Sequence, residues 1–272
     1  MAASGPPGSP AARLSPVATT DLPGFPVLEQ SGYRLRLAAG AEDLRRVQAL
    51  RYQVFNVELG EGFESSHATK LDRDDYDAHA HHLMVEHCSD GACIGTYRVQ
   101  TPAMAARGAG LYVAQEYDLA PLAELLPRAV EASRACVLRG HREGAPVQLL
   151  WKGLARYLAA TESRWLFGLC SLTTQDLDVA VRGWLHLRER GVLHPHLRVH
   201  PRPEFLCRPA AEIEASDLPP LESMPPLFDA YLRIATRVVG YPAVDRAFRT
   251  VDYLSLLDLE EVPSVVRRRF AD

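Results

Sequence analysis

The stretch that decides the fold is Glu131-Ala132-Ser133-Arg134, followed by the loop Arg139-Gly140-His141-Arg142-Glu143-Gly144 and by Ala145-Pro146. The first segment continues into an apolar run, which is typical of a strand that carries a few polar groups to its end. The loop is basic and contains glycine, and it leads into an apolar helix pattern whose first N–H groups favour an anion. The sequence therefore predicts an acid/base group beside a phosphate-binding helix N-terminus.

Strand and helix patterns alternate on both sides of this stretch. We expect strands at 33–37, 82–87, 92–100, 129–138, 165–171 and 251–257, and helices at 41–57, 119–127, 147–162, 176–190 and 226–239. Ser89-Asp90-Gly91 between two apolar runs is a hairpin signal. Helices interleaved with strands predict an α/β or α+β fold, in which helices flank a mixed central sheet.

Composition divides the chain into three segments. Residues 1–27 are rich in Ala, Pro, Ser and Gly with little charge, so we expect a disordered tail. Residues 28–205 carry most of the strand and helix patterns and are expected to form the core. Residues 206–272 open with a Pro-rich stretch, and we expect them to pack on that core as a C-terminal extension.

Composition also excludes several function classes. The 272 residues are 47% hydrophobic, enough for a sizeable core, and the net charge of −4 argues against nucleic-acid binding. No apolar run approaches the roughly 20 residues that span a bilayer, and no export signal is evident, which indicates a cytoplasmic protein. Five scattered cysteines without a C-x-x-C pair are typical of reduced thiols: Cys88, Cys93, Cys136, Cys170 and Cys207.

The segment 58–77 is strongly acidic. It contains seven carboxylates against Lys70 and Arg73, a local charge of −5. Such a surface can collect a substrate that bears an ammonium group, and the ordinary alternative is a solvated loop.

Six motifs follow one another in a fixed order, and together they resemble a known family. They are Arg51-Tyr52-Gln53-Val54-Phe55, the D-x-D-x-Y-D block 72–77, His82-Leu83-Met84-Val85, Gly95-Thr96-Tyr97-Arg98, the segment 131–137 and the segment 149–154. In this order the chain resembles the bacterial ornithine-lipid acyl-carrier-protein N-acyltransferases, often called hemolysin-like. This family is related to the acyl-homoserine-lactone synthases and has the GCN5-related N-acyltransferase (GNAT) fold. The lactone synthases usually carry a tryptophan soon after the first motif, whereas the first one here is Trp151, which favours the lipid-forming branch.

The resemblance implies an amide-forming acyltransferase. It would move a fatty acyl group, 3-hydroxyacyl in the family, from an acyl-carrier-protein thioester to the α-amine of ornithine or a similar amino acid, as the first step of ornithine-lipid synthesis. The donor would be acyl-phosphopantetheine, on carrier protein or coenzyme A, with no permanently bound cofactor. Two alternatives stay open: an acyl-homoserine-lactone or other N-acyl amino-acid synthase, and an acyl-carrier-binding module without turnover.

Catalysis is expected at the end of the strand 129–138. Glu131 would remove a proton from the amine, directly or through water, and Ser133 and Arg134 would complete the site. The alternative for Glu131 is an ion pair with Arg98 or Arg134.

The resemblance also implies residues for the two substrates. The thioester carbonyl would accept a hydrogen bond from a backbone N–H near Cys136 or Val137, where neighbouring strands splay apart. The phosphate would meet the loop before the helix 147–162, and basic residues there would suit an acidic carrier protein. The expected residues for the amino-acid substrate are Arg51, Phe55, Asp74, Asp77 and Arg98, of which Asp74 and Asp77 would hold the ammonium group and Arg98 the carboxylate. The expected phosphopantetheine-binding residues are Cys136, Val137, Arg139, Arg142 and Gly144.

No metal site is expected. His79-x-His81-His82 and His194-x-His196-x-x-x-His200 have spacings that a metal could use, but no cysteine or carboxylate completes either set. The basic run 265–270 is compatible with peripheral contact with anionic lipid.

Overall fold

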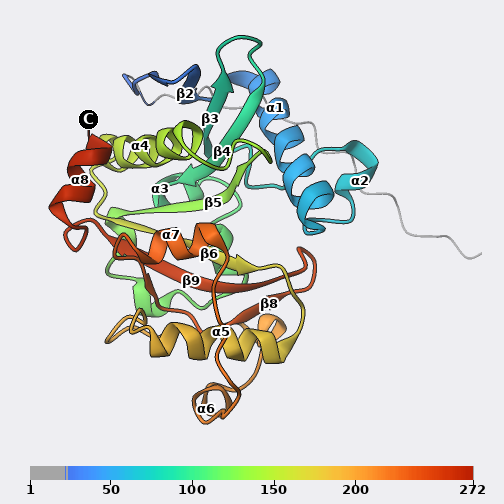
Figure 1. Ribbon diagram of the computed structural model, residues 1–272, viewed down its shortest axis with the longest axis vertical. Helices are drawn as coiled ribbons and strands as arrows, with labels where there is room; N and C mark the ends of the chain where they lie inside the picture. Colours follow the sequence, from blue (N-terminus) through green and yellow to red (C-terminus); the bar gives the residue numbers. More distant parts are fainter. Residues whose placement is uncertain (1–21, 23, 272) are drawn as a thin grey trace, which may run out of the picture.

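The computed structural model describes residue 22 and residues 24–271, with the side chains of 269–271 left aside (Figure 1). One sheet of nine strands runs through it in the order β1-β2-β3-β4-β5-β6-β9-β7, with β8 also paired to β9. The strands are β1 (Leu28–Gln30), β2 (Tyr33–Leu37), β3 (His81–His87), β4 (Cys93–Gln100), β5 (Ala129–Val137), β6 (Trp165–Leu172), β7 (Arg237–Val238), β8 (Ala243–Asp245) and β9 (Thr250–Asp258). Pairing is antiparallel except between β5 and β6, so the predicted mixed sheet is confirmed.

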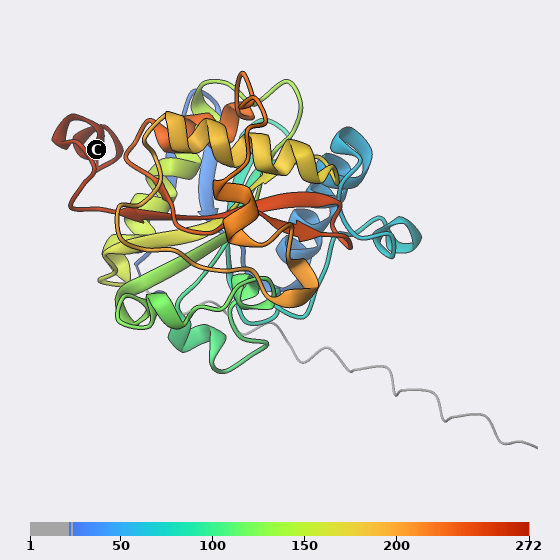
Figure 2. The same cartoon turned by 90° about the horizontal axis from the view of Figure 1, so that it is seen from below.

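Helices cover both faces of the sheet (Figures 1 and 2). The longer ones are α1 (Gly40–Tyr52), which continues as a π-helical segment at Gln53–Leu59, α4 (Ala145–Ala160) and α5 (Leu177–Glu189). The shorter ones are α2 (Ser66–Thr69), α3 (Pro102–Ala105), α6 (Ala210–Glu214), α7 (Pro226–Leu232) and α8 (Ser264–Ala271). Short 3-10 segments lie at Tyr112–Gln115, Ala120–Leu122, Leu126–Arg128 and Pro203–Phe205.

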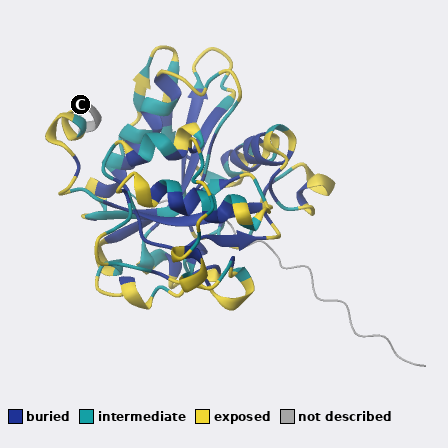
Figure 3. Ribbon diagram, turned by 60° about the horizontal axis from the view of Figure 1, so that its bottom comes forward, coloured by how far each residue is buried: buried dark blue, intermediate teal, exposed yellow. Residues whose placement is uncertain are grey.

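Alternation along the strands decides which helix packs on which face. Leu83 and Val85 of β3 belong to the buried cluster under α4, whereas Met84 between them packs against Val47 of α1. Successive side chains of a strand point to opposite faces, so this alternation places α1 and α4 on opposite sides of the sheet. Coloured by burial, the strands form the dark interior and the exposed residues gather on helices and loops (Figure 3).

The C-terminal segment is built into the same sheet rather than laid upon it. The strand β9 pairs with β6 from Trp165↔Asp258 to Leu172↔Val251, and β7 and β8 pair with β9. The expected helix 226–239 is shorter than predicted. It ends at Leu232 because Ala235 has a left-handed φ of +80°, after which residues 237–238 join the sheet. The expected helix 119–127 is replaced by two single 3-10 turns.

The expected tail 1–27 lies outside the described residues except for residues 22 and 24–27. Within these, Leu22 and Phe25 pack on the cluster under α4, and the ring of Phe25 contacts that of Tyr157. No helix in the described part of the chain is long and apolar enough to cross a membrane.

Candidate active site

The pairing of β5 and β6 is interrupted at the centre of the sheet. These parallel strands pair at Ala129↔Trp165, Val130↔Leu166 and Glu131↔Phe167 and no further, although both continue for several residues. At the last pairs the carbonyl oxygen of Ala132 lies so close to Gly168 that a Cβ there would overlap it. Beyond this contact β6 stays with β9 and β5 stays with β4, so the two strands diverge.

A bulge at the same place turns the backbone of β5. The register with β4 shifts between Arg98↔Ser133 and Thr96↔Cys136, and Arg134 has a left-handed φ of +52°. This conformation costs a non-glycine residue energy and is over-represented at functional sites. The bulge therefore shapes the β5 side of the gap.

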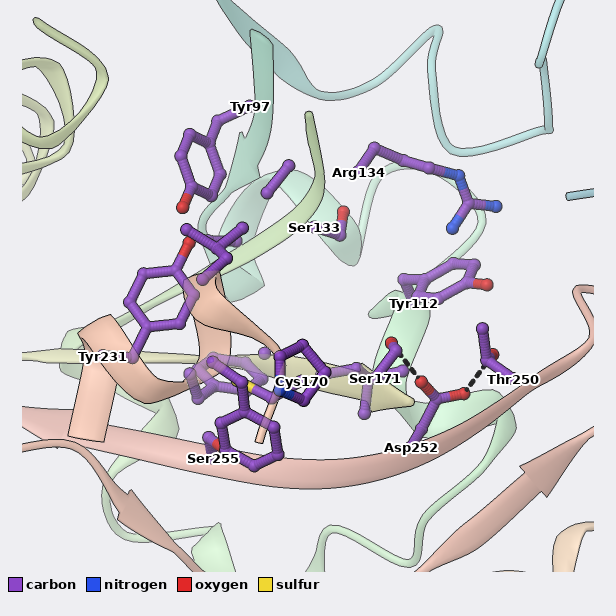
Figure 4. Close-up of a pocket in the computed structure, with 18 of the residues that line it drawn as sticks. Tyr97, Tyr112, Ser133, Arg134, Cys170, Ser171, Tyr231, Thr250, Asp252 and Ser255 are labelled. Carbon is purple, nitrogen blue, oxygen red and sulfur yellow. Dashed lines mark hydrogen bonds between the residues drawn. The ribbon is translucent and has the colours of Figure 1, made fainter. Parts of the chain in front are cut away.

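A cavity of about 290 Å³ occupies the gap (Figure 4). From β5 it is lined by residues 132–135, and from β6 by residues 166–171. Its two ends differ in character. One end is apolar, with Leu154, Leu166, Phe228, Tyr231 and Leu257, and the other is acidic and hydroxylic, with Glu61, Ser171, Thr173, Asp245, Thr250 and Asp252.

A second cavity of about 310 Å³ adjoins the apolar end. It shares Leu154, Leu166, Tyr231, Thr236 and Leu257 with the first cavity, and it continues between α4 and α8. Its remaining lining is mostly apolar, and Trp151 and Tyr231 stack there with ring centroids 5.8 Å apart. The two cavities together offer an apolar passage from the bulge in β5 to the face of α4.

Behind the bulge lies a buried network of three arginines and three aspartates. Arg51 of α1 donates to Asp72 and Asp77 over 2.7 and 2.8 Å, and the Arg134 Nη2 donates to Asp74 over 3.0 Å. Arg98 of β4 pairs with both Asp74 and Asp77. Three positive and three negative groups balance one another in the interior, which is how buried charge is tolerated.

These contacts set the protonation of the aspartates. Burial alone would raise the pKa of Asp77, but the guanidinium groups of Arg51 and Arg98 outweigh it and hold this pKa far below its usual value. The pKa of Asp74 is lowered in the same way, against burial, by Arg98 and Arg134. Both carboxylates are therefore ionised and already paired with arginines.

Glu131 is held in the interior, with 1% of its surface exposed. Its carboxylate accepts hydrogen bonds from the backbone N–H groups of Tyr112 and Val113, over 3.0 and 2.8 Å, and from Gln100 Nε2 over 2.6 Å. Burial raises its pKa, and these three donors oppose the rise. Neither of the alternative ion pairs, with Arg98 or Arg134, is found for Glu131 among the contacts of the described residues.

The predicted residues separate into two groups. Phe55, Ser133 and Arg134 line the cavity. The predicted residues that do not line it are Glu131, Arg51, Asp74, Asp77, Arg98, Cys136, Val137, Arg139, Arg142 and Gly144. Cys136 is buried in the cluster with Phe55, and burial raises the pKa of its thiol, which makes it a poor nucleophile.

The loop before α4 has the form that anion binding requires. Gly144 has a φ of +75°, which favours glycine, and α4 then begins with Ala145 and Pro146. The N-cap residue Gly144 makes no side-chain hydrogen bond to the first turn of α4, which leaves N–H groups there that suit an anion. Arg142 folds back over the end of β5, where its Nε donates to the carbonyl of Val137 over 2.9 Å.

Sequence reasoning missed the acidic end of the cavity. Asp245 and Asp252 line it, and Glu116 joins them from a third segment without lining it. Burial followed by nearby carboxylates raises the pKa of Asp252 to about 7. A signal was present, because Asp252 is a carboxylate near the start of a mostly apolar strand.

Both histidine groups contain residues with hydrogen-bond partners, and in the second group His194 Nδ1 accepts from the backbone N–H of Leu197 over 3.0 Å. His82 is buried with its Nε2 3.2 Å from the carbonyl of Asp77, and His81 Nδ1 lies 2.9 Å from the Tyr157 hydroxyl. Across the described part of the chain, the acids Glu116, Asp245 and Asp252 form the one group of side chains whose spacing would suit a metal.

Comparison with known proteins places this geometry in context. Residues 50–152 match the model of the acetyltransferase (GNAT) domain family. The L-ornithine N(alpha)-acyltransferase of Rhodobacter capsulatus is 34% identical over 239 residues, which cover 84% of this chain and 90% of that protein. The protein of the same name from Rhizobium meliloti is 30% identical over 243 residues, covering 84% and 80%. The solved structure of an N-acyl amino acid synthase from uncultured soil microbes aligns with a TM-score of 0.48 at 10% identity, covering 84% of this chain and 91% of that one.

Proposed function

Because this chain belongs to the L-ornithine N(alpha)-acyltransferase family, with a GNAT domain, we propose that it transfers a fatty acyl group from a thioester to the α-amine of ornithine or a similar amino acid. The product is an amide and a free thiol. The observation that carries the proposal is the early end of β5–β6 pairing, which opens a cavity with Ser133 and Arg134 on one wall and an apolar passage beside it.

The donor would enter this gap with its thioester beside residues 132–135. A backbone N–H of the bulged strand would donate to the carbonyl oxygen as negative charge develops on it, without reorganisation during the reaction. That this donor belongs to Cys136 or Val137 stays a prediction, since the cavity is lined by the four residues before them. The acyl chain would follow the apolar passage toward α4 and α8.

The other end of the donor would rest on the start of α4. A phosphate placed there would meet the first N–H groups of α4, and Arg139 and Arg142 belong to the loop before them, although Arg142 is paired with Glu58 in the structure. We propose that the phosphopantetheine arm belongs to acyl carrier protein, because the acidic surface of that protein complements these arginines. We also propose that the acyl group attached to the arm is a 3-hydroxyacyl chain. Coenzyme A carries the same arm, and the experiment below separates the two.

Glu131 is our proposed proton acceptor for the incoming ammonium group. Its raised pKa supports this role, because a general base works best with a pKa near the operating pH. Since Glu131 does not line the cavity, the proton would travel through a water molecule. Direct contact of Asp74, Asp77 or Arg98 with the amino acid stays a prediction, and their mutual ion pairs also fix Arg134 at the bulge.

The proposal is tested by incubating the purified protein with 3-hydroxyacyl carrier protein and ornithine. Mass spectrometry is expected to detect the Nα-acyl amino acid, and thiol release is expected to match its amount. Parallel reactions with acyl-coenzyme A and with S-adenosylmethionine as acceptor identify the donor and the acceptor. Acyl transfer to S-adenosylmethionine and not to ornithine would overturn the proposal, as would thioester loss without an amide product.

A further inference from the structure

Three carboxylates that the proposed reaction does not use meet beside the acidic end of the cavity, where Asp245 and Asp252 line it and Glu116 does not. Glu116 follows the 3-10 turn Tyr112–Gln115, Asp245 ends β8 and Asp252 lies in β9. One carboxylate oxygen from each lies within 4.8 Å of the other two, and all three residues are buried.

The three groups differ in their partners. Asp252 accepts hydrogen bonds from the hydroxyls of Ser171 and Thr250, and one oxygen of Asp245 accepts from the backbone N–H groups of Ala247 and Phe248, over 2.8 Å each. Glu116 is different. It is 1% exposed, and neither of its oxygens has a hydrogen-bond partner among the described residues.

An unpartnered carboxylate beside two others is costly in the interior. Burial, and then Asp252 and Asp245, hold the pKa of Glu116 well above its usual value, while the Arg134 guanidinium opposes this. Without a ligand the group can relieve the repulsion by sharing a proton between Glu116 and Asp252. A cation that brings its own hydrogen-bond donors would relieve it and satisfy the free oxygens at once.

Two of the three acids face the cavity that contains the proposed reaction centre, and Glu116 lies within 4.8 Å of both without lining it. Asp245 and Asp252 line the same cavity as Ser133. In Figure 4, Asp252 and Thr250 lie on one side and Tyr231 on the other, with Ser133 between them. An acceptor at the acidic end would therefore have its reacting amine beside the bulge and its remaining groups near the carboxylates.

We propose that Glu116, Asp245 and Asp252 form a subsite for a second ammonium group, the one on the side chain of a diamino acid acceptor. This inference rests on the proposed function, because it assumes that the first amine of that acceptor attacks the thioester. An alkylammonium ion carries three N–H donors, which matches three converging carboxylates. A divalent ion such as Ca²⁺ takes six to eight oxygen ligands, whereas one oxygen from each of three carboxylates converges here.

The test compares ornithine with norvaline, which has the same carbon chain and lacks the terminal ammonium group. Glu116→Gln and Asp252→Asn remove charge from the subsite, and Glu124→Gln repeats the first substitution at an exposed position. The ratio of kcat/KM for ornithine to that for norvaline is expected to fall at least tenfold in the first two variants and to stay unchanged in the control. Without any donor, ornithine should raise the Tm of the parent more than norvaline does, and this difference should vanish in Glu116→Gln.

Three other outcomes would contradict either the subsite or the proposed function. An unchanged ratio and an unchanged ligand-induced Tm difference in folded Glu116→Gln and Asp252→Asn would overturn the subsite. A rise in the Tm of the parent with millimolar Ca²⁺ or Mg²⁺ that is lost in Glu116→Gln would also overturn it, in favour of a metal site. If ornithine raises the Tm more than norvaline does but no acyl transfer occurs, the proposed function would be contradicted and the subsite would be supported.

Discussion

The carbonyl oxygen of Ala132 in β5 lies against Gly168 in β6, at the position that a Cβ would occupy. This contact comes directly after the last paired residues, Glu131 and Phe167. The width of the gap at its closed end is therefore set by the absence of a side chain at position 168. The cavity that we assign to the thioester begins at this point.

Gly168→Ala should push β5 and β6 apart and distort the bulge. We expect at least a tenfold loss of kcat/KM and a loss of about 1–3 kcal/mol in unfolding free energy, as for other overpacked sites. Gly91→Ala is the control. It introduces strain at a φ of +70° in a remote hairpin with open space around it, so it should lower stability and leave activity unchanged. Equal activity of the two variants, measured well below both Tm values, would contradict the account.

Asp77 stabilises the fold by neutralising Arg51 and Arg98. Asp77→Asn leaves these buried guanidinium groups short of a negative charge, so the unfolding free energy at pH 7 should fall by about 3–5 kcal/mol. Urea unfolding measures this loss. Asp75→Asn, at an exposed position in the same segment, should change it by no more than about 0.5 kcal/mol.

The contribution of Asp77 should also depend on pH with a definite sign. Its pKa in the folded protein lies below the ordinary value of 3.8, so its stabilisation is complete above that pH and is lost as the pH falls. The difference in unfolding free energy between parent and Asp77→Asn should therefore be constant from pH 7 to pH 5 and about 1 kcal/mol smaller at pH 3. A difference that is largest at pH 3 would show that the aspartate is not held ionised by the arginines.

Glu131→Gln distinguishes two possible roles of Glu131: accepting the proton of the amine, and holding the loop at Tyr112 and Val113 by hydrogen bonds. If Glu131 accepts the proton, kcat should fall by about 100-fold or more, because general base catalysis contributes that much. Gln100→Met is the comparison, since it removes one donor to Glu131 and keeps the carboxylate. Should both variants lose activity equally, and in step with their Tm values, Glu131 would be a residue that only holds Tyr112 and Val113 in place.

Ala155→Trp tests the path of the acyl chain. Ala155 of α4 lines the second cavity, so an indole there should fill the apolar passage beyond Leu154 and Tyr231. Rates with long acyl chains should fall at least tenfold, while rates with a four-carbon chain should change little. Ala160→Trp adds the same side chain at an exposed position at the end of the same helix and should not discriminate. Equal losses for short and long chains in Ala155→Trp would place the acyl chain elsewhere.

Local patterns were enough to predict the elements that carry the site. The strand 129–138 and the helix 147–162 are confirmed within two residues as β5 and α4, because apolar periodicity and Pro146 act locally. The helix expected at 226–239 was wrong beyond Leu232. Its apolar run continues through residue 239, but residues 237–238 gain a partner in β9, which no local pattern reveals.

Charge could be counted from the sequence but not paired. The segment 58–77 has a net charge of −5. In the structure, however, Asp72, Asp74 and Asp77 form ion pairs with arginines of α1, β4 and β5. The same limit hid the carboxylates at the acidic end, because Glu116 lies more than a hundred residues before Asp245 and Asp252 in the chain. Contacts of this length follow from sheet order, which depends on the whole fold.

The central claim is that the thioester lies in the gap between β5 and β6. A structure with an unreactive thioether analogue of acyl-phosphopantetheine tests it most directly. We expect the sulfur beside residues 132–135, the acyl chain in the passage lined by Leu154 and Tyr231, and the phosphate at the first turn of α4. An analogue bound outside this gap, with β5 and β6 unchanged and the cavity empty, would contradict the account.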